Sequence, residues 1–214
     1  MVKWLPLLAL ALLGFAGRPG TAPRYVPPTG WRNNGWAVPF HEEWFGGQLR
    51  AMHEPPLATA ADLGSWSRRF RLLVLPSFRP GLAFRIDEDG KGGARMREVL
   101  LDGRGGYEPG AIAKESERSL TSEEVAWIDR AIEAAGLRRL PMQPPQPQVK
   151  NGTIMVCADG TMFVFELLDG RGRSFQERGC IEPEKPLRAL IEAVSRLDPV
   201  LGERALDSLE PKRR

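Results

Sequence analysis

The sequence predicts an α+β fold in which one or more antiparallel sheets carry two packed helices. Two tight turns, Asp159-Gly160 and Asp169-Gly170-Arg171-Gly172, are flanked by β-branched and aromatic residues, as in β-hairpins. They bracket a strand over 161–168. Beyond them, apolar residues recur with a helical period at Leu187, Leu190, Ile191, Val194 and Leu197. This stripe predicts a helix from Leu187 to Asp198 with one apolar face on the sheet.

The composition is that of a folded protein without a strong charge bias. The 214 residues, 42% of them hydrophobic, are enough for the core of one domain or of two small ones. The net charge of +3 comes from 30 basic and 27 acidic residues, and the only dense basic run is the terminal Lys212-Arg213-Arg214. Because phosphate recognition needs clustered basic residues, we expect no nucleic-acid partner.

The N-terminus has the pattern of an export signal. Lys3 precedes an apolar run over 4–15, and Gly14 and Ala16 are small residues at the positions that a signal peptidase reads. We therefore expect a signal peptide over 1–16 and a periplasmic or secreted protein. The alternative is an uncleaved anchor, but the run is shorter than the roughly 20 residues that span a bilayer. No stable membrane span is expected after cleavage.

Cys157 and Cys180 are the only cysteines, and an exported protein meets an oxidising compartment. We therefore predict that they form a disulfide. In a regular ladder Cys157 would lie opposite Met162, and Met162 would lie opposite Gly179. Cys180 would then be two strands away from Cys157, about 10 Å, which is too far for a disulfide. The prediction therefore includes Gly179 lying outside regular pairing.

Residues 17–66 are rich in proline, glycine and tryptophan, and we expect a mostly irregular segment there. One short helix over 42–52 is compatible with Phe45, Leu49 and Met52 on one side, although Gly46 and Gly47 weaken it. Exposed aromatic side chains mark interaction surfaces, whereas buried ones would anchor the segment to the sheet. The candidate binding surface consists of Trp31, Trp36, Phe40, Trp44 and Phe45.

Residues 67–140 form the first expected unit of strands and a helix. Strands are predicted over 69–75, 82–87 and 94–101, with a polar, exposed edge strand over 111–118. The strand over 82–87 alternates and is expected to be half-buried. Thr121-Ser122-Glu123-Glu124 is a capping box, and Gly136 is a stop signal, so a helix is expected over 122–135.

The two halves of the chain share an order of elements. A proline-rich connector over 141–150 precedes a second unit over 151–200, and 201–214 is expected to be a tail. Leu100-Leu101-Asp102-Gly103-Arg104-Gly105 recurs unchanged as Leu167-Leu168-Asp169-Gly170-Arg171-Gly172. Together these features favour a βββα duplication.

A family resemblance follows from several short motifs taken together. These are Trp44-Phe45-Gly46-Gly47-Gln48-Leu49-Arg50, Glu54-Pro55-Pro56-Leu57, Asp102-Gly103, Gly105-Gly106-Tyr107, the capped helix after Leu120-Thr121 and the hairpins from Asp159-Gly160 to Cys180. From Trp44 to Leu197 the chain resembles a group of exported bacterial α+β proteins of unknown function. That family has no established activity, so the resemblance implies no catalytic residue.

Two function classes remain for the chain. The sequence has no Gly-x-Ser-x-Gly elbow, and hairpin turns explain Gly103, Gly105 and Gly106, so no cofactor and no catalytic residue are expected. The first class is therefore a non-catalytic envelope module that binds a protein, a peptide or a glycan. The alternative is a periplasmic metal-dependent hydrolase with the candidate ligands His41, Glu42, His53 and Glu54.

Overall fold

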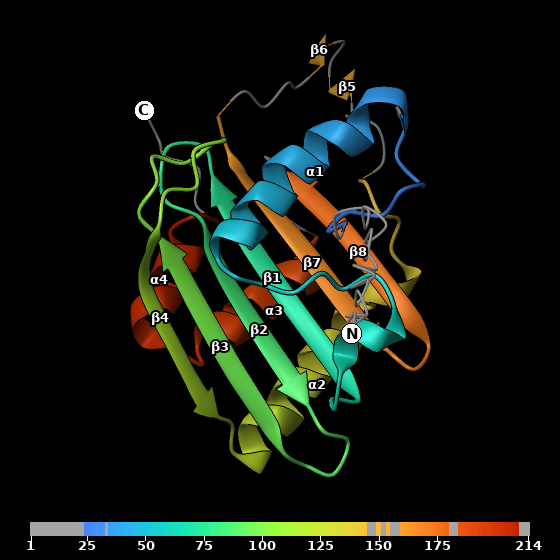
Figure 1. The fold of residues 1–214 in the computed structure, drawn as a ribbon, viewed down its shortest axis with the longest axis vertical. Helices are drawn as coiled ribbons and strands as arrows, with labels where there is room; N and C mark the ends of the chain where they lie inside the picture. Colours follow the sequence, from blue (N-terminus) through green and yellow to red (C-terminus); the bar gives the residue numbers. More distant parts are fainter. Residues whose placement is uncertain are drawn as a thin grey trace, which may run out of the picture.

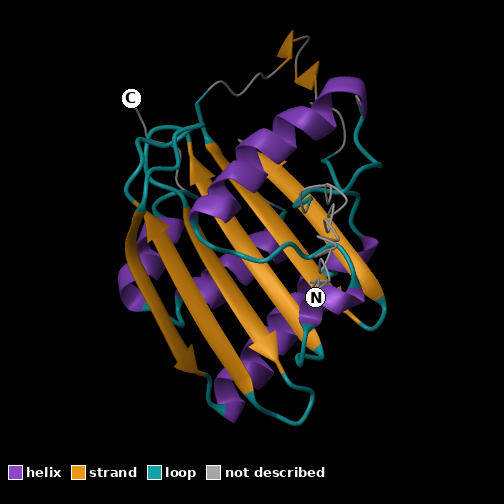
Figure 2. Ribbon diagram, viewed as in Figure 1, coloured by secondary structure: helices purple, strands orange, loops and turns teal. Residues whose placement is uncertain are grey.

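The structure, a computed structural model, describes residues 24–32, 34–144, 149–150, 153–154, 159–179 and 184–209. Its centre is a six-stranded sheet of strand order β4-β3-β2-β1-β7-β8, in which every neighbouring pair is antiparallel (Figure 1). The strands are β1 (Arg68–Pro76), β2 (Leu82–Glu88), β3 (Ala94–Leu101), β4 (Ile112–Ser119), β7 (Thr161–Asp169) and β8 (Gly172–Gly179). Helix α1 (Asn34–Ala51) crosses one face of the sheet, and three helices lie on the other (Figure 2). The predicted α+β fold is confirmed.

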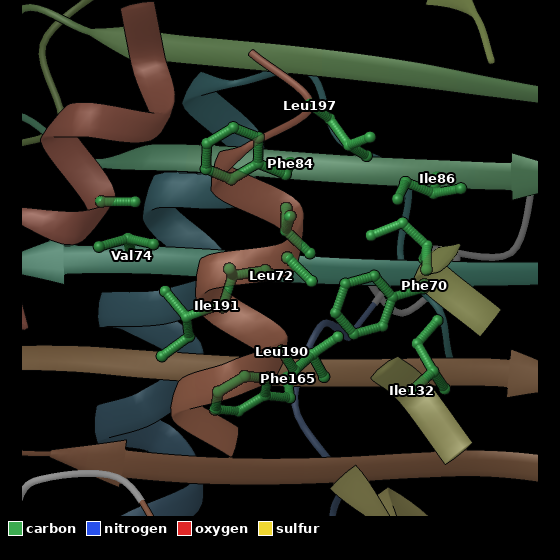
Figure 3. Packing of buried hydrophobic residues seen from close by; sticks show 14 of the residues in the cluster. Phe70, Leu72, Val74, Phe84, Ile86, Ile132, Phe165, Leu190, Ile191 and Leu197 are labelled. Atoms are coloured by element: carbon green, nitrogen blue, oxygen red, sulfur yellow. The ribbon is translucent and has the colours of Figure 1, made fainter. Parts of the chain in front are cut away.

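The larger apolar cluster lies under α2 (Ser122–Ala135), α3 (Lys185–Ser195) and α4 (Pro199–Leu206). Alternate residues of a strand point to one face of a sheet, and here they supply Phe70, Leu72, Phe84 and Phe165. Figure 3 shows these side chains meeting helix residues, which include Ile132, Leu190 and Ile191. Both predicted helices therefore pack on the sheet through their apolar stripes.

Local signals define α2 at both ends. The Thr121 hydroxyl accepts a hydrogen bond from the Glu124 backbone N–H, and the Glu124 carboxylate accepts one from the backbone of Thr121. Gly136 follows with a φ of 63°, a left-handed conformation that glycine adopts without steric cost. The predicted capping box and helix end are confirmed.

The second apolar cluster lies between the sheet and α1. Phe45 and Leu49 of α1, and Met52 just after it, are buried in the same cluster as Leu73 and Val99 of the sheet. Most of β2 is consequently buried on both faces. The expectation of a half-buried strand was wrong, because the segment predicted to be irregular supplies a covering layer.

Helix α1 is the main correction to the predicted N-terminal segment, since 18 residues are helical instead of a short stretch over 42–52. Local propensity argued against it, because Pro39 lies inside the helix and Gly46 and Gly47 are weak helix formers. Buried positions recur along it with helical spacing at Ala37, His41, Phe45, Gln48 and Leu49. Burial of this face outweighs the weak local propensity.

Helix α4 corrects the prediction of a C-terminal tail from residue 201. The Asp198 carboxylate accepts hydrogen bonds from the backbone N–H groups of Val200 and Leu201, which caps the helix. Pro199 occupies the first turn of α4, where its missing N–H has no cost. None of the helices in the described residues has the length and apolar character needed to span a membrane.

The predicted turn at 169–172 sets the register of β7 and β8. Asp169 pairs with Gly172, so Met162 lies opposite Gly179. The expectation that Gly179 would lie outside regular pairing was therefore wrong, while Cys157 and Cys180 lie outside the described residues. At the other side of the sheet, β4 is the exposed, charged edge strand that was predicted.

The comparison of the two halves is only partly within the described residues. The first half shows β2, β3, β4 and α2 in the expected order, and the second shows β7, β8 and α3. A separate two-stranded sheet joins β5 (Val149–Lys150) to β6 (Thr153–Ile154). Residues 155–158, which the predicted duplication also uses, are outside the described part, so the duplication stays a prediction. Two short 3-10 turns, η1 (Ala60–Leu63) and η2 (Leu137–Arg139), complete the description.

Candidate functional site

Three aromatic side chains form a partly exposed cluster on α1 and on the loop between β3 and β4, which we call the aromatic patch. Its members are Phe40, Trp44 and Tyr107. The ring centroids of Phe40 and Trp44 are 5.7 Å apart, and that of Tyr107 lies 5.8 Å from Phe40 and 5.2 Å from Trp44. Tyr107 is 65% exposed, whereas Phe40 and Trp44 are half-buried. The patch therefore combines anchored rings with one ring open to solvent.

Side-chain hydrogen bonds from α1 hold the backbone of the β3–β4 loop against this helix. The Gly106 carbonyl accepts hydrogen bonds from Trp44 Nε1 at 2.8 Å and from Gln48 Nε2 at 3.1 Å. Gly105 has a φ of +91°, and a Cβ there would lie 2.6 Å from the Arg79 backbone nitrogen, so only glycine fits against the β1–β2 turn. The same turn carries Phe78, which is 71% exposed. The contacts of Gly105 and Gly106 fix the backbone of the loop beside Trp44 and the β1–β2 turn.

The five residues of the predicted binding surface have different environments. Trp31 is 3% exposed and Phe45 is 0% exposed, so both serve the core. Phe40 and Trp44 belong to the aromatic patch, and the side chain of Trp36 lies outside the described part. Tyr107 was not among the predicted residues, because a position after two turn glycines does not by itself specify exposure.

The contacts of the His41 side chain are those of a residue that supports the fold. Its ring stacks on Trp31 with 4.1 Å between the centroids. Nδ1 lies 2.7 Å from the Ala37 carbonyl oxygen, and Nε2 lies 3.1 Å from Glu177 Oε2. These contacts join α1 to β8 and engage both ring nitrogens.

The other three candidate metal ligands lie in different surroundings. Glu42 accepts hydrogen bonds from the backbone of Tyr25 and forms an ion pair with Arg50 at 2.9 Å. His53 is exposed with a φ of 55°, and Glu54 is buried among arginines. Within the described residues, no group of three or more His, Cys, Asp or Glu side chains is arranged to hold a metal ion.

Glu54 is the centre of a buried ionic network on the α1 face of the sheet. Its carboxylate forms ion pairs with Arg71 at 3.3 Å, with Arg85 at 3.0 Å and with Arg97. Burial alone would raise the pKa of Glu54, but these arginines outweigh burial and hold that pKa below its ordinary value. The network fastens the chain that follows α1 to three neighbouring strands. Its sequence signal is charged residues at inward positions of otherwise apolar strands.

A second buried carboxyl group, Glu98 of β3, lies on the opposite face near the start of α4. Burial, together with a hydrogen bond to Asp198, raises the pKa of Glu98 to about 7, although the Ser116 hydroxyl acts in the opposite direction. Burial would also raise the pKa of Asp198, but the hydrogen bonds from Glu98 and from the α4 amides hold it below its ordinary value. A protonated Glu98 therefore donates to the carboxylate that caps α4.

Because of the Glu98–Asp198 pair, we expect the free energy of unfolding to fall as the pH rises from about 4.5 to about 7. The folded protein retains the Glu98 proton over this range, while the unfolded chain loses it near the ordinary glutamate pKa of 4.5. Unfolding thus releases a proton, and the loss for a shift of this size is at most about 3 kcal/mol. Urea unfolding at a series of pH values, compared with the same series for Glu98→Gln, measures it.

The Glu98→Gln variant is the matched control, because an amide keeps the shape and the donor but cannot ionise. Its stability is expected to exceed that of the unmodified protein at pH 8 and to approach it at pH 5. Identical pH profiles for the two proteins would contradict the assignment.

Comparison of the sequence with the profiles of known protein families and with curated proteins gives no match.

Proposed function

We propose that the protein is a non-catalytic binding module of the cell envelope, and that the aromatic patch is its contact surface. The partner is an envelope protein, a peptide or a glycan. The observation that carries the proposal is the exposure of Tyr107 within a cluster whose other rings are anchored. Large aromatic rings held in place bind with little loss of conformational entropy, which is why they dominate many interfaces.

The surroundings of the patch support the same proposal. Phe78 adds a second strongly exposed aromatic ring on the neighbouring β1–β2 turn, which touches the β3–β4 loop through backbone atoms. The export signal expected over 1–16 would deliver the chain to the envelope. Three of the residues considered for metal-dependent hydrolysis, His41, Glu42 and Glu54, have other partners in the described structure, so no observation favours that alternative.

Site-specific photo-crosslinking tests the proposal in bacterial cells that express the full chain. A photoreactive phenylalanine replaces Tyr107 in one variant and Val200 in another. Val200 is the matched control because it is 62% exposed but lies on α4. We expect a discrete crosslinked product from position 107, recovered with envelope proteins or with the sacculus, and none from position 200.

The outcome that would contradict the proposal is equally definite. The aromatic patch is not the contact surface if position 107 gives no product, or if both positions give the same products. Phe40→Ala, introduced beside the photoreactive residue at 107, should reduce the yield of a specific product because it removes a ring that supports Tyr107.

A further inference from the structure

A groove of about 380 Å³ lies between α2 and α3, on the opposite side of the sheet from α1. Trp127, Arg130 and Ala131 line it from α2, and Ala189, Ala193 and Arg196 line it from α3 and its end. On α2, Arg130 and Ala131 follow Trp127 by three and four residues, and along α3 and its end Ala193 and Arg196 follow Ala189 by four and seven, so each set lies along one side of its helix. The short alanine side chains leave a slot beside the Trp127 ring.

Two of the residues that line the groove, Arg130 and Arg196, carry a positive charge. Among the described residues, neither Arg130 nor Arg196 has an ion pair, and the Arg196 guanidinium lies 5.7 Å from the centre of the Trp127 ring. Glu192 also lines the groove, but it pairs with Arg188 at 3.1 Å. Asp129, the neighbour of Arg130 in the chain, forms its ion pair with Arg68.

We propose that this groove binds a small carboxylate that carries a flat apolar body. The guanidinium groups of Arg130 and Arg196 hold the carboxylate, because their planar donors match its two oxygens. The Trp127 ring and the alanine side chains receive the apolar body. This site is separate from the aromatic patch, so it stands or falls independently of the proposed function.

The test uses N-acetylphenylalanine and its amide, which share the same body and differ in charge. Each is titrated into the purified full-length protein while the indole N–H signal of Trp127 is followed by NMR. The Trp127→Phe variant identifies that signal by removing it. We expect the acid to shift the signal with saturation and to bind at least about tenfold more tightly than the amide.

Variants of the two arginines decide whether the groove is the site. Arg130→Ala and Arg196→Ala each replace an exposed side chain and should leave the fold intact. Each is expected to weaken binding of the acid about tenfold. Arg204→Ala, an exposed arginine on α4, is the control and should change binding by less than about twofold.

Two further ligands separate a free acid from a peptide end. Ala-Ala-Phe and its C-terminal amide test whether the carboxylate can belong to a peptide: binding of the peptide acid extends the site to peptide C-termini, and its failure restricts the site to small free acids. The proposal is overturned if acid and amide bind equally, if the Trp127 signal does not respond to N-acetylphenylalanine, or if the arginine variants bind like the unmodified protein.

Discussion

Arg71→Ala is expected to lower the free energy of unfolding by about 3–5 kcal/mol. The Arg71 side chain is fully buried, and its Nε donates to Glu166 Oε2 at 2.7 Å while Nη1 donates to the Pro55 carbonyl at 2.7 Å. Its removal leaves Glu54 and Glu166 buried with one cation fewer. The cost of an uncompensated buried charge far exceeds that of a lost surface contact. Urea unfolding followed by circular dichroism measures the loss.

Arg95→Ala is the matched control for Arg71. Arg95 is an arginine of β3 in the same sheet, but its ion pair with Glu117 at 2.8 Å is exposed to solvent. Such a pair contributes at most about 1 kcal/mol. If the two variants lose equal stability, the buried network does not hold the segment around Glu54 to the sheet.

A double-mutant cycle measures the interaction between Arg71 and Glu166. Glu166→Gln in the Arg71→Ala background removes one of the two carboxylates left without Arg71. The double variant is expected to be less destabilised than the sum of the two single changes, because the residues interact directly. Simple additivity would argue against coupling between them.

Phe45→Ala should lower the free energy of unfolding by about 3–5 kcal/mol. Phe45 is a fully buried residue of α1, and the centroid of its ring lies 4.8 Å from that of His41 and 4.9 Å from that of Trp44. Its loss opens a cavity between α1 and the sheet and removes support from the aromatic patch. Thermal and urea unfolding of the variant give the size of the effect.

Tyr107→Ala, in the same aromatic cluster, is expected to have little effect on stability, in contrast to Phe45→Ala. Because Tyr107 is mostly exposed, its removal should change the free energy of unfolding by roughly 0.5 kcal/mol or less while it weakens partner binding. A large loss of stability in Tyr107→Ala would mean that the ring is a structural support, and the proposed contact surface would then be wrong.

The sequence by itself determined those elements whose limits depend on neighbouring residues. The capping box at Thr121 and Glu124, the glycine at 136 and the turn from Asp169 to Gly172 act over a few residues, and each has the predicted role. The apolar period of α3 likewise identified the helix that packs on the sheet. Such signals are readable because the partners of each hydrogen bond or turn lie next to one another in the chain.

Only the tertiary structure decided the strand order and the environment of the aromatic residues. β1 pairs with β7 across a long stretch of chain, and no local pattern specifies that partner. α1 continues through Pro39 and two glycines because its buried face gains more from packing than the backbone loses in propensity. Trp31 and Tyr107 differ in exposure, although both follow turn residues, because α1 and β8 cover one and nothing described covers the other. Exposure depends on what lies across the fold, and that information is absent from the local sequence.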